Sequence, residues 1–331
     1  MKKILIIQTA FIGDVVLATS LVEKLYSYYP DARIHFLVRK GNEGLLLNNP
    51  KLDAVLVWNK KQHKLKNLFA MLKTIRANKY DRVINVQRFF ATGLLTAFSG
   101  AKETIGFNKN PLSFLFSKKI IHVFDLQRPR HEIERNNDLV CDITDNTAAK
   151  PKLYPSADDE KSILPYVTGK FVTMTPSSVW FTKKYPEEKW IELINRFDQA
   201  YSIYLLGGPD NRDECMRIAE KCNNKKLSVL AGSLSFLQSA ALMKQAEMNY
   251  VNDSAPLHFA SAMNAPVTAI FCSTIPAFGY TPLSDRSFII ETTEKLPCRP
   301  CGLHGKKTCP LSHFKCGYGI ETSQVLKTIN E

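Results

Sequence analysis

Short apolar runs alternate along the chain with longer segments of helical periodicity. The first run, Ile4–Ile7, lies in a predicted strand, Lys3–Gln8, and its unbroken apolar centre is typical of a strand buried on both faces of a parallel sheet. A helix follows in which Val16, Leu17 and Leu21 fall near helical spacing. Further elements of this half are predicted at Arg33–Val38, Ala54–Trp58 and Arg82–Val86 (strands) and Leu65–Ala77 (helix). This alternation predicts a doubly wound α/β domain.

The second half of the chain repeats the same pattern. A closing helix of the first half is predicted at His131–Ile143, and the polar, proline-containing stretch Asp145–Lys170 is interpreted as a linker. Strand Lys170–Met174 then leads toward an amphipathic helix, Glu187–Phe197. The remaining predicted elements are Ile203–Leu206, Leu227–Leu230, Leu234–Lys244, Met248–Val251, Val267–Phe271 and a last helix, Ser323–Ile329. We expect two Rossmann-like domains, residues 1–155 and 156–331, facing across a cleft in which ligands bind.

The amino-acid composition indicates a globular protein with a basic surface. The 331 residues suffice for two domains with their own cores, and no apolar run reaches the roughly 18 residues of a membrane span. The N-terminal apolar run is short and Asp14 follows soon after it, which favours a cytosolic first strand over a signal peptide. The net charge of +13, from 44 Lys and Arg against 31 Asp and Glu, favours an anionic partner or is simply a solvated basic face. No nucleic-acid-binding motif accompanies the charge.

Candidate chemistry gathers where predicted strands end, which is where open α/β sheets place their ligands. Asp14 lies just past the first strand, although it is equally suited to cap a helix. The second half offers hydroxyls, an ammonium group and a helix start, whose free N–H groups suit a phosphate or belong to an ordinary capped helix. These groups are Thr175, Ser177, Ser178, Lys183 and Asp253–Ala255. No G-x-G-x-x-G, P-loop, H-E-x-x-H or G-x-S-x-G motif is present.

Four segments in this order carry a resemblance to a known family. They are Ile6–Val16, with its Gly-Asp-Val-Val turn, Thr182–Pro186, Asn252–His258, and the cysteine-rich run Cys298–Cys316. Together they resemble glycosyltransferase family 9, the ADP-heptose:lipopolysaccharide heptosyltransferases, and heptosyltransferase II more than I.

Two positions depart from the family pattern. Ala255 stands where the family usually has Gly, so the backbone would approach a pyrophosphate less closely. Tyr185 replaces the commoner Trp and keeps an aromatic wall. Neither departure removes a charged group.

The resemblance implies a GT-B fold and a metal-independent, inverting transfer of heptose from ADP-heptose to the inner core of lipopolysaccharide. An inverting displacement needs a base for the acceptor hydroxyl, and Asp14 is the candidate. Charge on the leaving diphosphate would be offset by Lys183 together with the hydroxyl and N–H groups of Ser177, Ser178, Ser254 and Ala255. Three further donor-side candidates have alternatives: Asp253 holds a heptose hydroxyl or orients its loop, His258 reaches a phosphate or packs, and Asp210 binds the adenosine ribose or forms a turn.

The implied acceptor is a core sugar on Kdo and lipid A, whose acidic groups suit the basic excess. Such an acceptor places the enzyme at the cytoplasmic face of the inner membrane as a peripheral protein. Arg88, Arg128 and Arg130 are acceptor-side candidates by position alone, and a solvated surface explains each of them equally well. The rival functions are a related enzyme acting on another nucleotide-sugar and a non-enzymatic protein that binds anionic polymers.

Four of the eight cysteines cluster as C-x2-C-x7-C-x6-C at Cys298, Cys301, Cys309 and Cys316. In a cytosolic protein this cluster indicates either a structural zinc site, although the spacing is not that of a standard zinc ribbon, or reduced or partly oxidised packing cysteines. No cofactor is expected to be needed for catalysis. The others, Cys141, Cys215, Cys222 and Cys272, are predicted to be small core residues. The last helix is expected to cross back to the first domain, as in GT-B enzymes.

Overall fold

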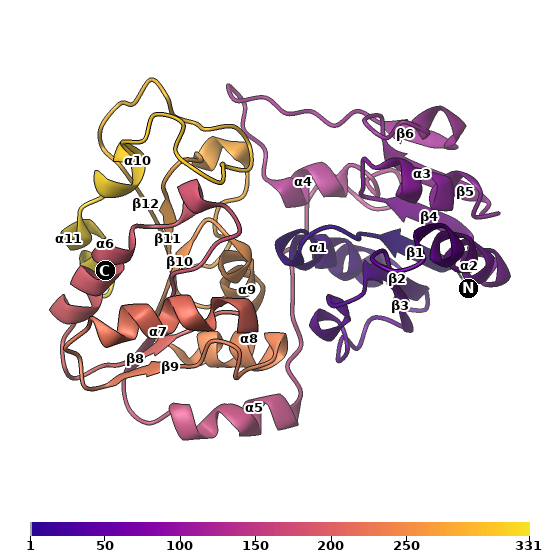
Figure 1. Ribbon diagram of the computed structural model, residues 1–331. Coiled ribbons are helices and arrows are strands. Elements are labelled where there is room, and N and C mark those ends of the chain that lie inside the picture. The colour runs from indigo at the N-terminus through magenta and orange to yellow at the C-terminus, as the bar shows by residue number, and fades with distance from the viewer. Residues whose placement is uncertain (1) are drawn as a thin grey trace. The chain divides into compact units, whose positions relative to one another are not determined.

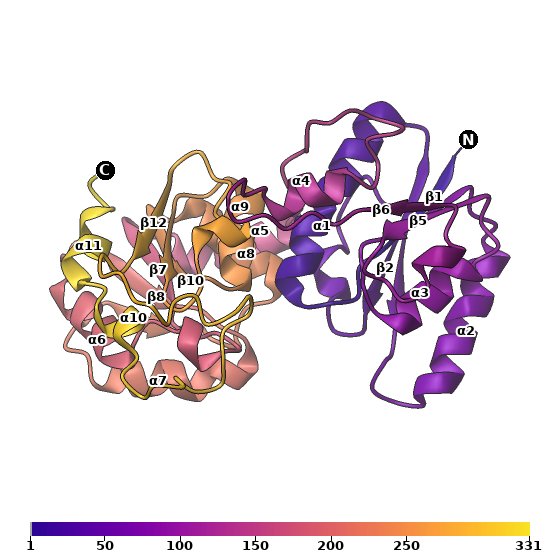
Figure 2. The same ribbon diagram turned by 90° about the horizontal axis from the view of Figure 1, so that it is seen from above.

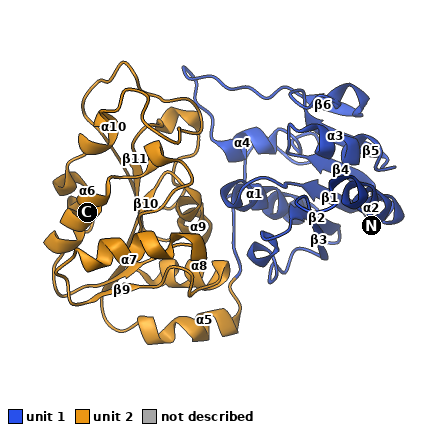
Figure 3. Cartoon of the chain, in the orientation of Figure 1, with its two compact units in different colours: residues 1–154 blue, residues 155–331 orange. Residues whose placement is uncertain are grey.

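The computed structural model describes residues 2–331 and divides into two compact units, residues 1–154 and 155–331 (Figure 3). Each unit contains one six-stranded sheet in which every pair of neighbouring strands is parallel. The division falls one residue from the boundary expected from the sequence. No helix in the described residues is both long and apolar enough to cross a membrane.

Unit 1 is a three-layer α/β domain with strand order β3-β2-β1-β4-β5-β6 (Figures 1 and 2). Ile4–Ile7 of β1 are fully buried, as their unbroken apolar run predicts. The strands are β1 (Lys3–Ile7), β2 (Arg33–Arg39), β3 (Ala54–Trp58), β4 (Arg82–Asn85), β5 (Glu103–Phe107) and β6 (Lys118–Ile120). The helices are α1 (Ile12–Tyr28), α2 (Lys64–Ala77), α3 (Phe90–Ala97) and α4 (Glu132–Asn137).

Helix α4 is shorter than the predicted helix His131–Ile143. Its start is well defined, because the His131 side chain accepts from the Ile133 N–H. Beyond it the chain continues as turns, and the Asn137 amide donates to the Asp145 carbonyl at 2.8 Å. Polar side chains that bond nearby backbone in this way compete with helix propagation.

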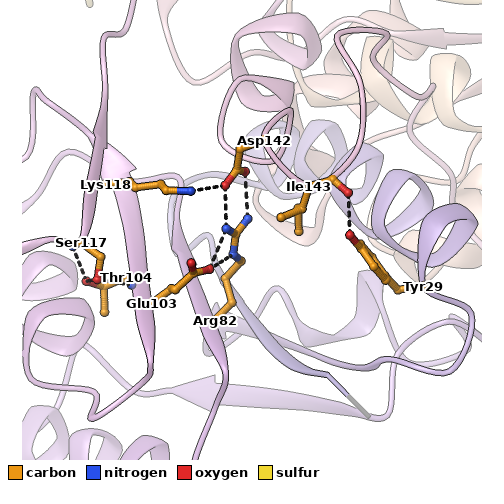
Figure 4. Close-up of polar contacts among 8 residues, drawn as sticks. All are labelled: Tyr29, Arg82, Glu103, Thr104, Ser117, Lys118, Asp142 and Ile143. Carbon is orange, nitrogen blue, oxygen red and sulfur yellow. Dashed lines mark hydrogen bonds and ion pairs between the residues drawn. The ribbon is translucent and has the colours of Figure 1, made fainter.

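The edge of the unit 1 sheet at which the strands begin is closed by a buried arginine (Figure 4). Arg82, at the start of β4, donates two hydrogen bonds to Asp142, at 2.9 and 2.7 Å, and one to Glu103 of β5 at 2.8 Å. Lys118 of β6 donates to the same Asp142. The Arg82 hydrogen bond, more than any other effect, lowers the pKa of Asp142 to about 2, so the carboxylate stays charged and ties three strands to the segment after α4.

Unit 2 has strand order β12-β11-β10-β7-β8-β9. Counted from its own first strand, this is the same order as in unit 1, the 3-2-1-4-5-6 arrangement of dinucleotide-binding folds. Its strands are β7 (Phe171–Thr175), β8 (Ser202–Leu205), β9 (Leu227–Val229), β10 (Met248–Asn252), β11 (Val267–Phe271) and β12 (Ser287–Glu291). Its helices are α5 (Ala157–Ile163), α6 (Glu187–Arg196), α7 (Arg212–Glu220), α8 (Phe236–Gln245), α9 (Ala255–Met263), α10 (Lys315–Tyr318) and α11 (Thr322–Lys327).

Two expectations about the ends of unit 2 need correction. The interpreted linker Asp145–Lys170 contains α5, which Ser156 caps by accepting from the Asp159 N–H. The last helix was expected to return to the first domain, whereas α11 packs against α6 of its own unit and places Val325 in that unit's core. Cys215 and Cys272 are fully buried, as predicted, but Cys141 and Cys222 are only partly buried.

Candidate active site at the carboxyl edges of the two sheets

In each unit the chemically interesting residues follow the ends of the strands, at what we call the carboxyl edge of the sheet. The first and fourth strands of each unit are neighbours, and the connections after them diverge to opposite sides. This is the topological switch point, where open α/β sheets bind ligands. In unit 1 it lies after β1 and β4, and in unit 2 after β7 and β10.

Asp14 lies in the first turn of α1, close behind the end of β1. Its carboxylate accepts from the Phe11 N–H at 3.1 Å, so it satisfies the backbone donor of the N-cap residue from inside the helix and is not itself the N-cap. The positive end of the helix dipole favours an ionised carboxylate at this position. A charged acceptor of protons therefore stands at the unit 1 switch point.

Two further cations, not among the residues predicted from the sequence, lie at the same edge. Lys60, two residues past β3, donates to the carbonyl and hydroxyl oxygens of Thr9 at 3.1 and 2.6 Å. Burial, with a smaller contribution from Arg39, lowers the pKa of Lys60 to about 8. Arg39 ends β2, and its guanidinium stands 5.2 Å from the centre of the Phe11 ring. Both come at or just past the ends of predicted strands, as Asp14 does, so their positions in the sequence carry the same signal.

The three arginines predicted on the acceptor side have different surroundings. Arg88 is exposed just after β4, at the switch point. Arg128 is exposed in the segment before α4. Arg130 instead makes a bidentate ion pair with Asp138, with both distances at 2.8 Å, which gives it a structural role beside α4. Their contact with an acceptor stays a prediction.

In unit 2 the structure brings Lys183 and Asp253 together. Lys183 ends a short 3-10 turn, η4 (Phe181–Lys183), and its ammonium is 2.7 Å from Asp253, just past β10. The Thr274 hydroxyl, from the loop after β11, donates to the same carboxylate oxygen at 2.6 Å. Asp253 thus connects Lys183 to the loop after β11, and its contact with a heptose hydroxyl stays a prediction.

Asn252 joins the other loops of this edge, a role that the sequence did not reveal. It is fully buried; its amide donates to the Pro176 carbonyl at 2.7 Å and accepts from the Tyr185 N–H at 2.8 Å. The loops after β7 and β10 and the turn that carries Lys183 are thus held by one side chain. Buried amides that satisfy several backbone groups fix their surroundings firmly, because losing them leaves those groups unpaired.

The predicted hydroxyl loop after β7 is already engaged in part. The Ser177 hydroxyl donates to Glu214 of α7 at 2.8 Å, and Lys184 pairs with the same carboxylate. The Ser177 hydroxyl therefore donates its hydrogen bond within unit 2. The Thr175 hydroxyl is buried without a hydrogen-bond partner among the described residues, and Ser178 is half-buried.

Helix α9 begins beside this network. Ser254 is its N-cap, but its side chain makes no capping hydrogen bond. Ala255 is the first helical residue, and Asp253 directly precedes the cap. His258 is buried in the next turn, whereas Asp210 is exposed in a short 3-10 turn after β8.

The four clustered cysteines and His313 line one cavity of about 290 Å³. Cys298 Sγ stands 3.9 Å from His313 Nε2. Burial, more than neighbouring charge, raises the pKa of Cys316 to about 11, so this thiol is protonated at neutral pH in the absence of a metal. Over residues 2–331 no three His, Cys, Asp or Glu side chains are arranged to hold a metal ion, and the zinc site stays a prediction.

The cysteine-rich loop is attached directly to the lysine turn. Lys306 N–H donates to the Thr182 hydroxyl at 2.8 Å, and Thr182 N–H donates back to the Lys306 carbonyl at 3.1 Å. Arg299 donates to the carbonyls of Cys272 and Thr274, at 2.8 and 2.7 Å. The loop therefore supports both Lys183 and the Thr274 hydroxyl that orients Asp253.

A family model described as glycosyltransferase family 9 (heptosyltransferase) matches residues 68–312. The chain belongs to glycosyltransferase family 9. The match includes Lys183, Asn252, Asp253 and three of the clustered cysteines, while Asp14 lies before it. The family assignment makes this protein a glycosyltransferase and confirms the resemblance inferred from its motifs.

Curated and solved members of family 9 extend the match over nearly the whole chain. Lipopolysaccharide heptosyltransferase 3 of Escherichia coli K12 is 28% identical over 304 residues, 87% of this chain and 88% of the relative. The structure of E. coli ADP-heptose lps heptosyltransferase II superposes with a TM-score of 0.81 at 21% identity, covering 100% and 98% of the two chains. E. coli heptosyltransferase WaaC with ADP gives 0.76 at 18% identity, covering 99% of each. The expected GT-B fold is thereby confirmed.

Proposed function

We propose that this family 9 enzyme transfers heptose from ADP-heptose to the inner core of lipopolysaccharide, with inversion at the transferred carbon. The observation that carries the proposal is the Lys183–Asp253 pair, fixed at the unit 2 switch point beside the start of α9. A lysine ammonium has three donors, so Lys183 can keep Asp253 and still bind a diphosphate oxygen. Similarity to heptosyltransferases, one of them solved with ADP, supports the nature of the donor.

The reaction divides between the two units. The acceptor hydroxyl oxygen bonds to the anomeric carbon of heptose while the bond from that carbon to the diphosphate breaks. Asp14 takes the hydroxyl proton, and ADP departs with the bonding electron pair. Lys183, with N–H groups at the start of α9, offsets the charge that develops on the diphosphate. No step in this scheme calls on a metal ion.

The proposed acceptor is a core sugar carried on Kdo and lipid A, bound at the carboxyl edge of unit 1. Arg39 ends β2, and Lys60 and Arg88 follow β3 and β4, so these cations lie at the same edge of the sheet as Asp14, which suits an acidic saccharide. Since this acceptor is anchored in lipid, we place the enzyme in the cytoplasm, at the inner face of the membrane. The net charge of +13 supports such a location.

A donor screen tests the proposal. The purified chain is incubated with a core acceptor lacking the heptose and with ADP-heptose, other ADP-sugars, UDP-sugars or GDP-sugars, and products are identified by mass spectrometry. We expect a mass increase of one heptose with ADP-heptose alone, and inverted anomeric configuration by NMR. Turnover only with a UDP- or GDP-sugar would overturn the proposed donor, and retention of configuration would overturn the single displacement.

A further inference from the structure

A segment at the margin of unit 1 exposes an unusual concentration of large apolar side chains. It runs from Lys109 to Arg130 through η2 (Ser113–Leu115) and β6, and we call it the β6 margin. Phe114 is 70% exposed and Ile121 68% exposed. Four more apolar side chains of this segment are exposed as well: Leu115, Val123, Phe124 and Leu126. Apolar patches on soluble proteins generally mark a surface that something covers.

The β6 margin is a defined surface and not a loose end. Phe116 is buried against Gly106 of β5, where an added Cβ would come within 2.7 Å of the Phe116 ring. Thr104 and Ser117 exchange backbone-to-hydroxyl hydrogen bonds at 3.1 and 3.0 Å. These contacts hold Phe116 and Ser117 against β5, while Phe114 and Leu115, just before them, stay exposed.

Strand β6 is the last strand of its sheet, so one of its edges has no neighbouring strand. Figure 1 shows the chain leaving β6 as a long extended stretch before it returns at α4. Ile121 directly follows the carboxyl end of β6. Because the sheet is parallel, this places Ile121 on the same edge as Asp14, the proposed base.

The charge of the β6 margin indicates what covers it. The segment has five Lys and Arg residues and a single acidic residue, Asp125. Lys118 and Arg130 are paired with Asp142 and Asp138, whereas Lys119 is exposed beside them. Exposed aromatic and aliphatic side chains interleaved with lysines favour the interface of an anionic bilayer, where the apolar groups enter the headgroup layer and the cations meet phosphate.

We propose that the β6 margin is the surface with which this enzyme rests on an anionic lipid bilayer. Phe114 and Ile121 enter the interfacial layer, and Lys119 contacts anionic headgroups. This inference rests on the proposed function, in that a lipid-anchored acceptor must be met at the membrane. The consequence is that the acceptor sugar emerges from the bilayer next to the edge that carries Asp14.

Sedimentation with large unilamellar vesicles tests the inference on the full chain. Vesicles contain phosphatidylcholine alone or with phosphatidylglycerol, at low and high salt. We expect binding to the anionic vesicles that weakens with salt, a loss of at least about tenfold in partitioning for Phe114→Ser with Ile121→Ser, and a smaller loss for Lys119→Glu. Phe69→Ser, which removes a similarly exposed phenylalanine from α2, is the matched control and should bind as the wild type does.

Turnover with a deacylated, water-soluble acceptor separates this inference from the proposed function. We expect the double variant to keep wild-type turnover on that acceptor and to lose it selectively on acceptor embedded in vesicles. If the wild type binds vesicles but transfers no heptose, the proposed function is wrong and the docking surface is still supported. Equal vesicle binding by wild type and double variant would overturn the docking surface. A wild-type dimer that the double variant dissociates would overturn it too, by showing that a second copy covers the margin.

Discussion

The carboxyl edges of the two sheets share one topology but are closed in different ways. In unit 1 the loops after the first and fourth strands meet through the side chains of Gln8 and Gln87. In unit 2 the corresponding loops are held by the buried amide of Asn252 and by a carboxylate that pairs with Lys183. Strand order alone therefore does not decide what an edge binds; the side chains that close it do.

This difference matches what each edge is proposed to bind. A nucleotide diphosphate is compact and carries its negative charges on one group. A site that buried polar groups already hold in place loses little conformational entropy when it binds such a ligand. A core saccharide presents hydroxyls and acidic groups over a wider area. Unit 1 offers it Asp14 together with Arg39, Lys60 and Arg88, which come from the ends of three different strands. The following experiments test this difference between the two edges.

The largest effect is expected from Asp14→Asn. The amide keeps the size of the side chain but cannot take a proton, so kcat should fall about 10²- to 10⁴-fold with little change in KM for ADP-heptose. Steady-state kinetics measure it, with Asp31→Asn, an exposed carboxylate after α1, as the control. A variant with near wild-type kcat would remove Asp14 as the base.

The second largest effect is expected when the positive charge of Lys183 is removed. Changing it to Met alone would leave Asp253 buried without its cation, so the informative variant is Lys183→Met combined with Asp253→Asn. Loss of a charged hydrogen bond to the diphosphate should weaken ADP binding about tenfold to a hundredfold by calorimetry. Unchanged ADP affinity in a folded double variant would transfer the leaving-group role to other residues.

Asn252→Ala tests the rigidity of the unit 2 edge. The change leaves the Tyr185 N–H and Pro176 carbonyl without their partner, which should cost about 1–3 kcal/mol of unfolding free energy and raise KM for the donor more than it lowers kcat. Asn195→Ala on α6, whose side chain accepts only an exposed N–H, serves as the control. Equal effects of the two changes would contradict a special role for Asn252 in closing the edge.

A pH profile probes the cations of unit 1. Burial and Arg39 lower the pKa of Lys60 to about 8, so its ammonium loses its proton as the pH rises through that value. Affinity for an acidic acceptor should therefore decline severalfold between about pH 7 and 9. Lys60→Arg, which stays charged, should abolish the decline. An identical profile in both proteins would exclude Lys60 from acceptor binding.

The smallest effect on catalysis is expected at the cysteine cluster. If the four cysteines hold zinc, one of the two alternatives that the sequence leaves open, the purified chain carries about one zinc ion, and chelation lowers the melting temperature of unit 2. Elemental analysis and thiol titration decide the matter. Metal-free protein with all eight thiols titratable on unfolding would identify the four as packing cysteines, and the loop would then depend on its contacts with Thr182 and on the hydrogen bonds of Arg299.

The ends of apolar runs in the sequence are enough to locate much of the fold and several site residues. Asp14, Lys183 and Asp253 can be found in this way because they follow clear apolar runs. Strands β5, β6 and β12 were missed: β5 contains Gly106 and β6 is only three residues long, so neither forms a recognisable apolar run. The hydrogen bonds that assemble the unit 2 edge could not be predicted from the sequence either. Tyr185 and Asn252 are 67 positions apart, and polar pairs so far apart do not appear as a periodic pattern.

Gly305 shows how closely the cysteine-rich loop and the lysine constrain one another. Its φ of +75° suits glycine, and a Cβ there would lie 2.9 Å from the Lys183 Cγ and 3.0 Å from the Thr182 hydroxyl. Any larger residue would have to displace the stem of the lysine. Substitutions at this position of the loop are therefore limited by Lys183, which lies far upstream in the chain. A redesigned loop would also change the position of the Lys183 ammonium.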